Sequence, residues 1–167
     1  MIVLGVDPGA ATTGYGVVAR RSDGAVSLLE CGVVRTQSGQ PLALRLRQIY
    51  EGLRHVLLRH AVEAVAVEGV FYARNVHTTV VLGHARGAAL LAAAMHDLPV
   101  AEYAPAEIKQ AIVGTGRASK EQVQFMVQQL LRLRTPPRPN DAADAVAVAL
   151  CHCSIGVLLE RVRAARS

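Results

Sequence analysis

The chain opens with a short apolar run that ends in an acid. Residues 1–6 are almost all apolar, and Asp7 and the turn-forming pair Pro8–Gly9 follow directly. A continuous apolar run of this length, bounded by turn residues, is typical of a buried strand. Because burying an unpaired carboxylate is costly, the acid at the tip of such a strand needs a donor or a metal ion as its partner.

Further strands follow from the same kind of pattern. Small and β-branched residues predict strands over 12–20 and 26–34, joined through the polar turn at 22–24 as an antiparallel hairpin. Glu63–Glu68 is another apolar run that ends in an acid, and Pro99–Tyr103 predicts a last short strand. The helical pattern ahead of Glu63–Glu68 predicts a crossover that brings this strand back parallel to its neighbour.

Helical spacing marks the longer segments between these strands. Apolar residues from Leu42 to Leu57 recur as on an amphipathic helix, with Arg45, Arg47 and Arg54 expected on its outer side. Ala, Gly and Val dominate 76–96, which predicts a long helix with a small-residue surface. We expect this helix to be buried, either under the sheet or against another subunit.

Three more helices are predicted after the last strand. Pro105 is well placed in the first turn of a helix that ends near Val113. The capping-box pattern Ser119–Gln122 opens the next helix. Its apolar stripe consists of Val123, Met126, Val127, Leu130 and Leu131. The final helix begins near Asn140, a favourable N-cap residue, and extends to Leu150 or beyond.

Together these elements predict an α/β fold, a mixed sheet of three antiparallel strands plus parallel strands, flanked by helices. A chain of 167 residues fits one domain, here residues 1–167, and can bury a core without disulfides. The N-terminus has no basic segment ahead of its apolar run, and no run is long enough to span a membrane. With three cysteines, too few and odd in number for a disulfide framework, we expect a cytoplasmic protein without membrane partners.

The basic charge favours a polyanionic partner. The formal net charge is +5 and the pI is about 9.6. Only two of the eighteen basic residues are lysines, Lys109 and Lys120, so either composition bias or a chemical role accounts for them. Cys151-His152-Cys153 looks like a metal cluster, but residues two apart on a helix point in different directions. We therefore expect no structural metal there.

Four carboxylates carry the candidate chemistry. Asp7 and Glu68 both end apolar strands, and sites in open α/β sheets form outside the carboxyl ends of strands. Asp141 and Asp144 lie three apart in the first turn of the last helix, so they share a face. A single site near the strand ends could collect all four acids.

Simpler roles remain open for each acid. Asp141 and Asp144 would suit helix capping and the helix dipole, Asp7 an Asx-turn, and Glu68 a buried salt bridge. Two like charges about 4 Å apart repel by about 4 kcal/mol at an effective dielectric constant of 20. A helix dipole returns only about 0.3–1 kcal/mol. Converging acids would therefore need a divalent cation, for which oxygen ligands indicate magnesium or manganese.

Several motifs in series resemble the RuvC family, bacterial Holliday junction resolvases with a ribonuclease H-like fold. They are DPG with TGYG, VEGVF, LGHARG, VGTGRASKEQV and NDAADAVAVA. The resemblance covers about residues 1–153 and keeps order and spacing. It implies that the family's metal-binding catalytic acids correspond to Asp7, Glu68, Asp141 and Asp144, although some members carry histidine at the position of Asp141. The implied cofactor is Mg²⁺, with Mn²⁺ as a substitute, at one or two ions per subunit.

The resemblance also points to DNA contacts. Lys109 and Lys120 match positions where family members have important basic residues near the scissile phosphate. Phe71 matches the position proposed to stack on an unpaired base at the junction.

The residues around Phe71 suit DNA in their own right. Phe71–Tyr72 and Arg74 give an aromatic pair and a cation just beyond Glu68, and base stacking is worth about 1–3 kcal/mol per base. Core packing is the alternative for both aromatics. Arg117, in the glycine loop 114–117, could contact phosphate or be a solvated charge.

The implied activity is that of a structure-selective endonuclease in homologous recombination and DNA repair. It would bind four-way junction DNA as a homodimer and make two symmetric nicks by metal-dependent hydrolysis. We expect the helix at 76–96 to form the dimer interface, and RuvA and RuvB to be partners.

Three other functions compete with this one. A junction-binding scaffold would share the basic charge, but four acids would oppose phosphate binding. An actin-like sugar or acetate kinase would need a duplicated second half. A ribonuclease H-like nuclease acting on RNA would differ in substrate preference. The sequence lacks the GxSxG and GxxxxGK[ST] motifs, which argues against serine hydrolases and P-loop NTPases.

Overall fold

The computed structural model describes residues 1–69 and 76–164, and the side chains of that part as far as residue 155. Its strands are β1 (Ile2–Asp7), β2 (Thr12–Arg20), β3 (Val26–Arg35), β4 (Ala64–Glu68) and β5 (Val100–Tyr103). Its helices are α1 (Leu42–Arg59), α2 (Val76–Ala94), α3 (Pro105–Val113), α4 (Lys120–Leu130) and α5 (Asn140–Ala164). The element order and type agree with those predicted from the sequence pattern.

The strands form one mixed sheet in the order β3-β2-β1-β4-β5. β1, β2 and β3 pair antiparallel, whereas β4 and β5 continue the sheet parallel to β1. Val6 pairs with Val67, so Asp7 and Glu68 follow side by side at the same end of neighbouring strands. The predicted mixed α/β sheet is therefore confirmed.

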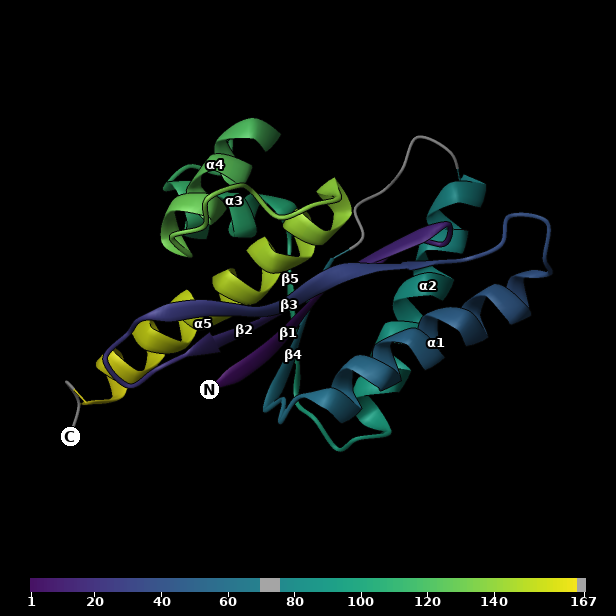
Figure 1. Cartoon of the computed structure of the whole chain (residues 1–167), viewed down its shortest axis with the longest axis horizontal. Coiled ribbons are helices and arrows are strands. Elements are labelled where there is room, and N and C mark those ends of the chain that lie inside the picture. The colour runs from purple at the N-terminus through teal and green to yellow at the C-terminus, as the bar shows by residue number, and fades with distance from the viewer. Residues whose placement is uncertain (70–75, 165–167) are drawn as a thin grey trace.

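Helices cover both faces of the sheet (Figure 1). Successive strand residues point to opposite faces, so Val3 and Leu4 belong to different cores. The core under α1 and α2 includes Leu4, Val6, Val17, Ile49, Leu53, Val65 and Val67. The core under α3, α4 and α5 includes Val3, Val18, Ala66, Val123, Val127 and Val146. Both faces of the central strands are thus buried, which explains their continuous apolar runs.

Glycines in β1 and β2 allow α5 to lie directly on the sheet. A Cβ atom at Gly14 would overlap the carbonyl oxygen of Asp141, and one at Gly5 would overlap that of Ala145. At Gly16 a Cβ would come within 2.5 Å of Val146. Any side chain at these positions would push α5 away from the strands. The close approach carries the first turn of α5 to the end of β1.

Two side chains differ from the sequence prediction. Arg45 was expected on the outer side of α1 but is half-buried: its Nε donates to the Thr36 hydroxyl at 3.1 Å and its Nη2 to the Ala10 carbonyl at 2.8 Å. The first turn of α1 lies beside the loops that follow β1 and β3, so the Arg45 side chain contacts these loops and not solvent alone. Leu130, predicted in the apolar stripe of α4, is 41% exposed because the helix ends there. Asn140 begins α5 rather than capping it, a difference within the usual uncertainty of helix ends.

The small-residue helix α2 is buried on one side only. Its alanines at 85, 88, 89, 92 and 93 pack toward the sheet and α1. On the opposite side Val76, Val80 and Leu91 are exposed in the single chain. The predicted burial of α2 therefore holds for its alanine side, whereas the opposite side is exposed in the single chain. Among the described residues, no helix is both long and apolar enough to cross a membrane.

The Cys-His-Cys segment lies in α5, and its two cysteines belong to the hydrophobic core on that face of the sheet. Cys151 and Cys153 are buried free thiols, and burial raises the pKa of Cys151 to about 12 and that of Cys153 to about 11. Between them, His152 Nδ1 lies 2.7 Å from the Tyr103 hydroxyl. The three side chains therefore pack and hydrogen-bond within the fold, and the bond ties α5 to β5.

Candidate active site

Asp7 stands at the end of β1, and the loop after it is held from several sides. The buried hydroxyl of Thr13 donates to the Gly9 carbonyl at 2.8 Å. The Thr36 hydroxyl donates to the Ala10 carbonyl at 2.6 Å, alongside the guanidinium described above. Since hydrogen-bonded loop carbonyls resist displacement, Asp7 is presented by a rigid strand end.

Two further acids reach Asp7 from the first turn of α5. Asp7, Asp141 and Asp144 each offer a carboxylate oxygen, and these atoms lie within 4.8 Å of one another. All three side chains are partly buried. The glycine-mediated contact between α5 and the sheet produces this arrangement. The structure thus brings together acids that are more than 130 positions apart in the sequence.

Glu68 joins the cluster from the end of β4. Burial first, and then the charge of Asp7, raise the pKa of Glu68. Burial first, and then the charge of Asp144, raise the pKa of Asp7. Asp7 and Glu68 each appear among the groups that shift the other's pKa, which agrees with their positions at the same end of the neighbouring strands β1 and β4.

Lys120 supplies positive charge to the cluster. Its Nζ lies 2.5 Å from Asp144 Oδ2, and this hydrogen bond raises the pKa of the lysine. Lys120 is the first residue of α4, whose N-terminus carries the predicted capping box of Ser119 and Gln122. Its side chain is 50% exposed, so the ammonium faces both the acids and solvent.

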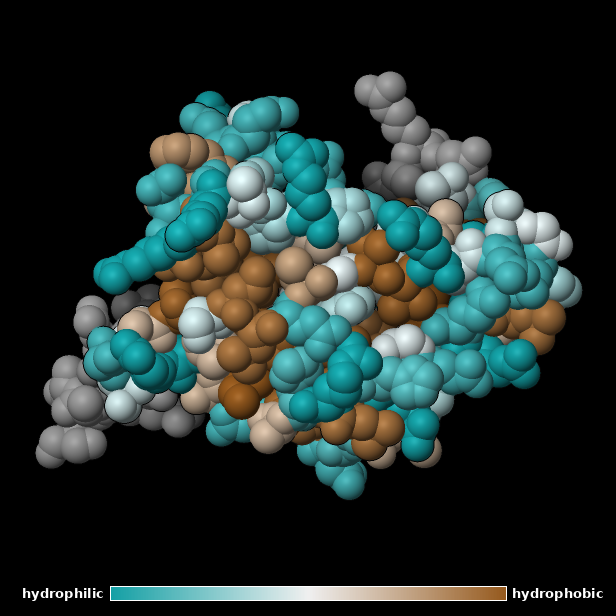
Figure 2. Space-filling view, viewed as in Figure 1, coloured by the Kyte–Doolittle hydropathy of each residue, from teal (hydrophilic) through white to brown (hydrophobic). Residues whose placement is uncertain are grey.

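A cavity of about 240 Å³ opens beside these residues. Its polar lining consists of Glu68, Asp144, Lys109 and Lys120. Its apolar wall consists of Pro105, Ile108, Val123 and Ala147. The two lysines of the chain therefore meet at one cavity, together with two of the four acids. Figure 2 shows the surface hollowed between the part built from α3 and α4 and the part built from α2.

Of the other predicted DNA contacts, only Arg117 lies among the described residues, and it is not brought into this cluster. Arg117 is exposed on the loop between α3 and α4, and does not line the cavity. Phe71, Tyr72 and Arg74 lie outside the described residues. Their proposed stacking and phosphate contacts remain predictions.

The donor set fits a hard divalent cation. Several carboxylates converge, with no sulfur or nitrogen ligand in the group. Oxygen-only sites of this kind suit Mg²⁺ or Mn²⁺. Burial first, and then the charge of neighbouring acids, raise the pKa of Asp7 and Glu68, and a bound cation would favour their charged forms.

The side chains that hold this site in place were not predicted from the sequence. Thr13 is fully buried, but threonine is common in strands and its sequence position gives no sign of this burial. Thr36 lies in a polar loop. Gln110 at the end of α3 also braces a loop, as described below. No local pattern marks such residues. The glycines at 5, 14 and 16 were a usable signal, since glycine inside a strand often marks close backbone approach.

Comparisons of the sequence with known proteins agree with one another. Residues 3–152 match the family described as crossover junction endodeoxyribonuclease RuvC. The RuvC of Pelotomaculum thermopropionicum is 49% identical over 152 residues, covering 91% of this chain and 92% of that protein. The RuvC of Moorella thermoacetica is 50% identical over 161 residues, covering 96% of each.

Solved structures show the same likeness. Thermus thermophilus RuvC, solved in complex with a Holliday junction substrate, matches with a TM-score of 0.90 and 40% identity, covering 95% of this chain and 96% of that one. The yeast mitochondrial Holliday junction resolvase matches with a TM-score of 0.70 at 15% identity, covering 96% of this chain and 82% of that one. At that identity the second likeness concerns the fold alone.

Proposed function

The chain belongs to the RuvC family of crossover junction endodeoxyribonucleases, and from this premise we propose how its residues cleave a four-way DNA junction. The protein is an endonuclease that resolves Holliday junctions in recombination and repair. The observation that carries the mechanism is the meeting of Asp7, Glu68, Asp141 and Asp144 beside a lysine-lined cavity. We propose that these acids are the catalytic group and that residues 1–167 act as one nuclease domain.

Mg²⁺ is the proposed cofactor, and Mn²⁺ a substitute, at one or two ions per subunit. The ligands would be Asp7, Asp141 and Asp144, whose oxygens already lie close together, with Glu68 beside them. When bound, the ion supplies Lewis-acid activation of water and stabilisation of the leaving oxygen. The chain's own contribution is to hold the acids in a rigid, partly buried cluster.

The proposed reaction is hydrolysis of one phosphodiester bond in each of two opposing strands. The oxygen of water forms a bond to phosphorus, and the bond from phosphorus to the 3′-oxygen breaks. A proton from water ends on the 3′-hydroxyl, and the other product carries a 5′-phosphate. Lys120, beside Asp144, and Lys109, across the cavity, would offset the charge of the phosphate.

Asp7→Asn tests the catalytic role of the cluster. Loss of one ligand charge removes several kcal/mol of stabilisation, so we expect nicking of a labelled four-way junction in Mg²⁺ to fall by about 10³-fold or more. Binding of the junction in EDTA should persist. Asp97→Asn is the matched control, because Asp97 is exposed in the turn that follows α2 and should leave nicking unchanged. Full nicking by Asp7→Asn would refute the proposed site.

The same experiment separates the rival functions. A junction-binding scaffold would bind the labelled four-way junction but leave it uncut with or without Mg²⁺. A ribonuclease H-like enzyme acting on RNA would cut an RNA–DNA hybrid in preference to the junction. We expect cleavage of the junction only with a divalent ion.

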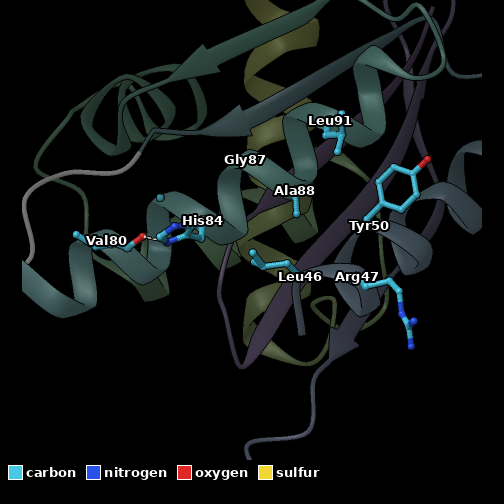
Figure 3. A pocket seen from close by; sticks show the side chains of 9 residues that line it. Leu46, Arg47, Tyr50, Val80, His84, Gly87, Ala88 and Leu91 are labelled. Carbon is cyan, nitrogen blue, oxygen red and sulfur yellow. Dashed lines mark hydrogen bonds between the residues drawn. The ribbon is translucent and has the colours of Figure 1, made fainter. Parts of the chain in front are cut away.

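We further propose that the protein acts as a homodimer through the exposed side of α2. A groove of about 640 Å³ runs between α1 and α2 (Figure 3). Leu46 and Tyr50 of α1 line it from one side, and Val80 and Leu91 of α2 from the other. Exposed apolar surface of this kind marks an interaction site, and two copies of one surface form an isologous interface. Two symmetric nicks require two active sites, which a dimer supplies.

Leu91→Glu tests this interface. A charge in an apolar contact is costly, so we expect the variant to sediment as a monomer at concentrations where the unaltered protein is a dimer. Leu58→Glu is the matched control, since Leu58 is equally exposed on α1 but lies outside the groove. An unchanged sedimentation coefficient for Leu91→Glu would place the interface elsewhere. By family membership we also propose RuvA and RuvB as partners, and the cytoplasm as the place of action.

A further inference from the structure

The loop between α3 and α4 is held by one side chain. Gln110, in the last turn of α3, donates from Nε2 to the Gly114 carbonyl at 2.8 Å. Its Oε1 accepts from the Gly116 amide at 3.1 Å. Its backbone carbonyl accepts from the Gly114 amide at 2.9 Å. A single residue therefore makes three hydrogen bonds to the turn that follows it.

The turn depends on the hydrogen bonds from Gln110 because glycine residues restrict the backbone conformation very little. Gly114 ends α3 with a φ of +89°, the left-handed region, and Gly116 follows two residues later. Two glycines in four residues give the unbraced chain many accessible conformations. Ordering such residues costs conformational entropy, which the hydrogen bonds from Gln110 help to offset.

The braced loop carries one cation and leads to another. Arg117 lies on the loop with its side chain exposed. Three residues later Lys120 contacts Asp144, so the Cα atoms of Arg117 and Lys120 are at most about 11 Å apart. Lys109, the neighbour of Gln110, lines the same cavity. Gln110 thus lies in a segment that places Lys109 and Lys120 at the cavity beside the acid cluster and carries Arg117 between them in the sequence.

We propose that Gln110 is a positioning residue that holds Arg117 where its guanidinium binds a DNA phosphate next to the one being cleaved. The inference rests on the proposed function and adds a residue to its substrate contacts. The side-chain amide of Gln110 is suited to holding the loop, because it donates to one loop carbonyl and accepts from one loop amide at the same time. Arginine, with its planar set of donors, is well suited to phosphate.

The other end of α4 offers a matched control. Gln128 Nε2 donates to the carbonyls of Leu133 at 3.2 Å and Arg134 at 3.1 Å. The residue type is the same, and like Gln110, Gln128 donates from Nε2 to carbonyl oxygens of the turn that follows its helix. Its turn, however, follows α4 and does not lead to Lys120. Gln110→Ala and Gln128→Ala should therefore cost similar stability but differ in their effect on DNA.

The experiment measures junction binding by the full-length protein in EDTA over a range of salt concentrations. The variants are Gln110→Ala, Arg117→Ala, their double variant, and Gln128→Ala. Removing one phosphate contact weakens binding several-fold and reduces the slope of log Kd against log salt by about 0.9. We expect both single variants to show this change and the double variant to be no weaker than Arg117→Ala alone. Gln128→Ala should keep the slope of the unaltered protein.

Gln110→Glu adds a chemical test of the brace. A carboxylate accepts from the Gly116 amide but cannot donate to the Gly114 carbonyl, so it should not restore binding. The proposal is overturned if the Gln110 and Arg117 effects are additive, if Arg117→Ala binds normally, or if Gln128→Ala lowers the slope equally. These outcomes concern binding in EDTA, whereas the proposed function is tested by cleavage of the junction in Mg²⁺ and by its loss in Asp7→Asn. The two failures are therefore distinguishable.

Discussion

Glu30 and Asp7 are both partly buried carboxylates of the sheet, but their surroundings shift their pKa in opposite directions. Glu30 accepts hydrogen bonds from Arg59 Nη2 at 2.5 Å and the Tyr15 hydroxyl at 3.0 Å, and lies 2.7 Å from His60 Nε2. The bond from Arg59 contributes most to holding the pKa of Glu30 at about 2. This group joins the end of α1 to β2 and β3.

Asp7 has the opposite environment. Its neighbours are other acids, and burial together with their charge raises its pKa. The chain supplies Lys120 to the cluster, and that lysine bonds to Asp144 rather than to Asp7. The comparison shows how structural and functional acids differ here. Glu30 receives its positive charge from the protein, whereas the Asp7 cluster is left to receive it from a metal ion.

The stability of the metal-free protein should depend on pH through the Asp7 cluster. Folding raises the pKa of Asp7 and Glu68, so between about pH 4 and 7 the folded state holds protons that the unfolded chain has lost. The free energy of unfolding should therefore fall as pH rises through this range, by on the order of 2 kcal/mol. Glu30 has a lowered pKa, and its contribution is lost only as pH falls toward 2.

Urea denaturation in EDTA at pH 5 and pH 8 checks this expectation. Asp7→Asn removes one of the two coupled carboxyls, so it should flatten the pH dependence and be more stable than the unaltered protein at pH 8. If the variant shows the same loss of stability between pH 5 and 8, then the acids are not the source of the effect.

Glu30→Gln should act in the opposite sense. The amide cannot pair with the charge of Arg59, and we expect the free energy of unfolding at pH 7 to fall by about 1 kcal/mol, because the pair is partly exposed and screened. Nicking per folded molecule should be unchanged. Glu51→Gln is the control, since Glu51 makes only a long, exposed pair with Arg47 at 3.8 Å. A folded Glu30→Gln protein without nicking activity would show that the Glu30 group is more than structural.

Lys120→Met tests whether lysine and metal compete for Asp144. The Nζ atom bonds Asp144, which is a proposed metal ligand, and its charge would repel the ion. We expect Mn²⁺ to bind the variant about 3–10-fold more tightly in calorimetric titration, while nicking decreases. Lys109→Met should change Mn²⁺ affinity less, because Lys109 lines the cavity without a bond to an acid in the described structure. Weaker Mn²⁺ binding to Lys120→Met would indicate that the lysine supports the metal site.

Much of the fold followed from local patterns. The strand ending at Asp7, the helix Pro105–Val113 and the capping box at Ser119 were predicted to within a residue or two. Each prediction depends on residues close together in the sequence, namely an apolar run, a proline in the first helical turn and a capping box. The inward turn of Arg45 and the exposure of Leu130 were not predicted, because they depend on which surfaces meet and on where a helix ends against its neighbours.

The sequence by itself determined where the strands and helices lie, which acids end them, and which family the motifs resemble. Only the tertiary structure decided that Asp141 and Asp144 reach Asp7, that α5 lies close against the glycines of the sheet, and that Glu30 pairs with Arg59. The physical reason is that secondary structure depends on energies between residues a few positions apart. The site depends on packing between residues far apart in the chain, and no local pattern contains that packing.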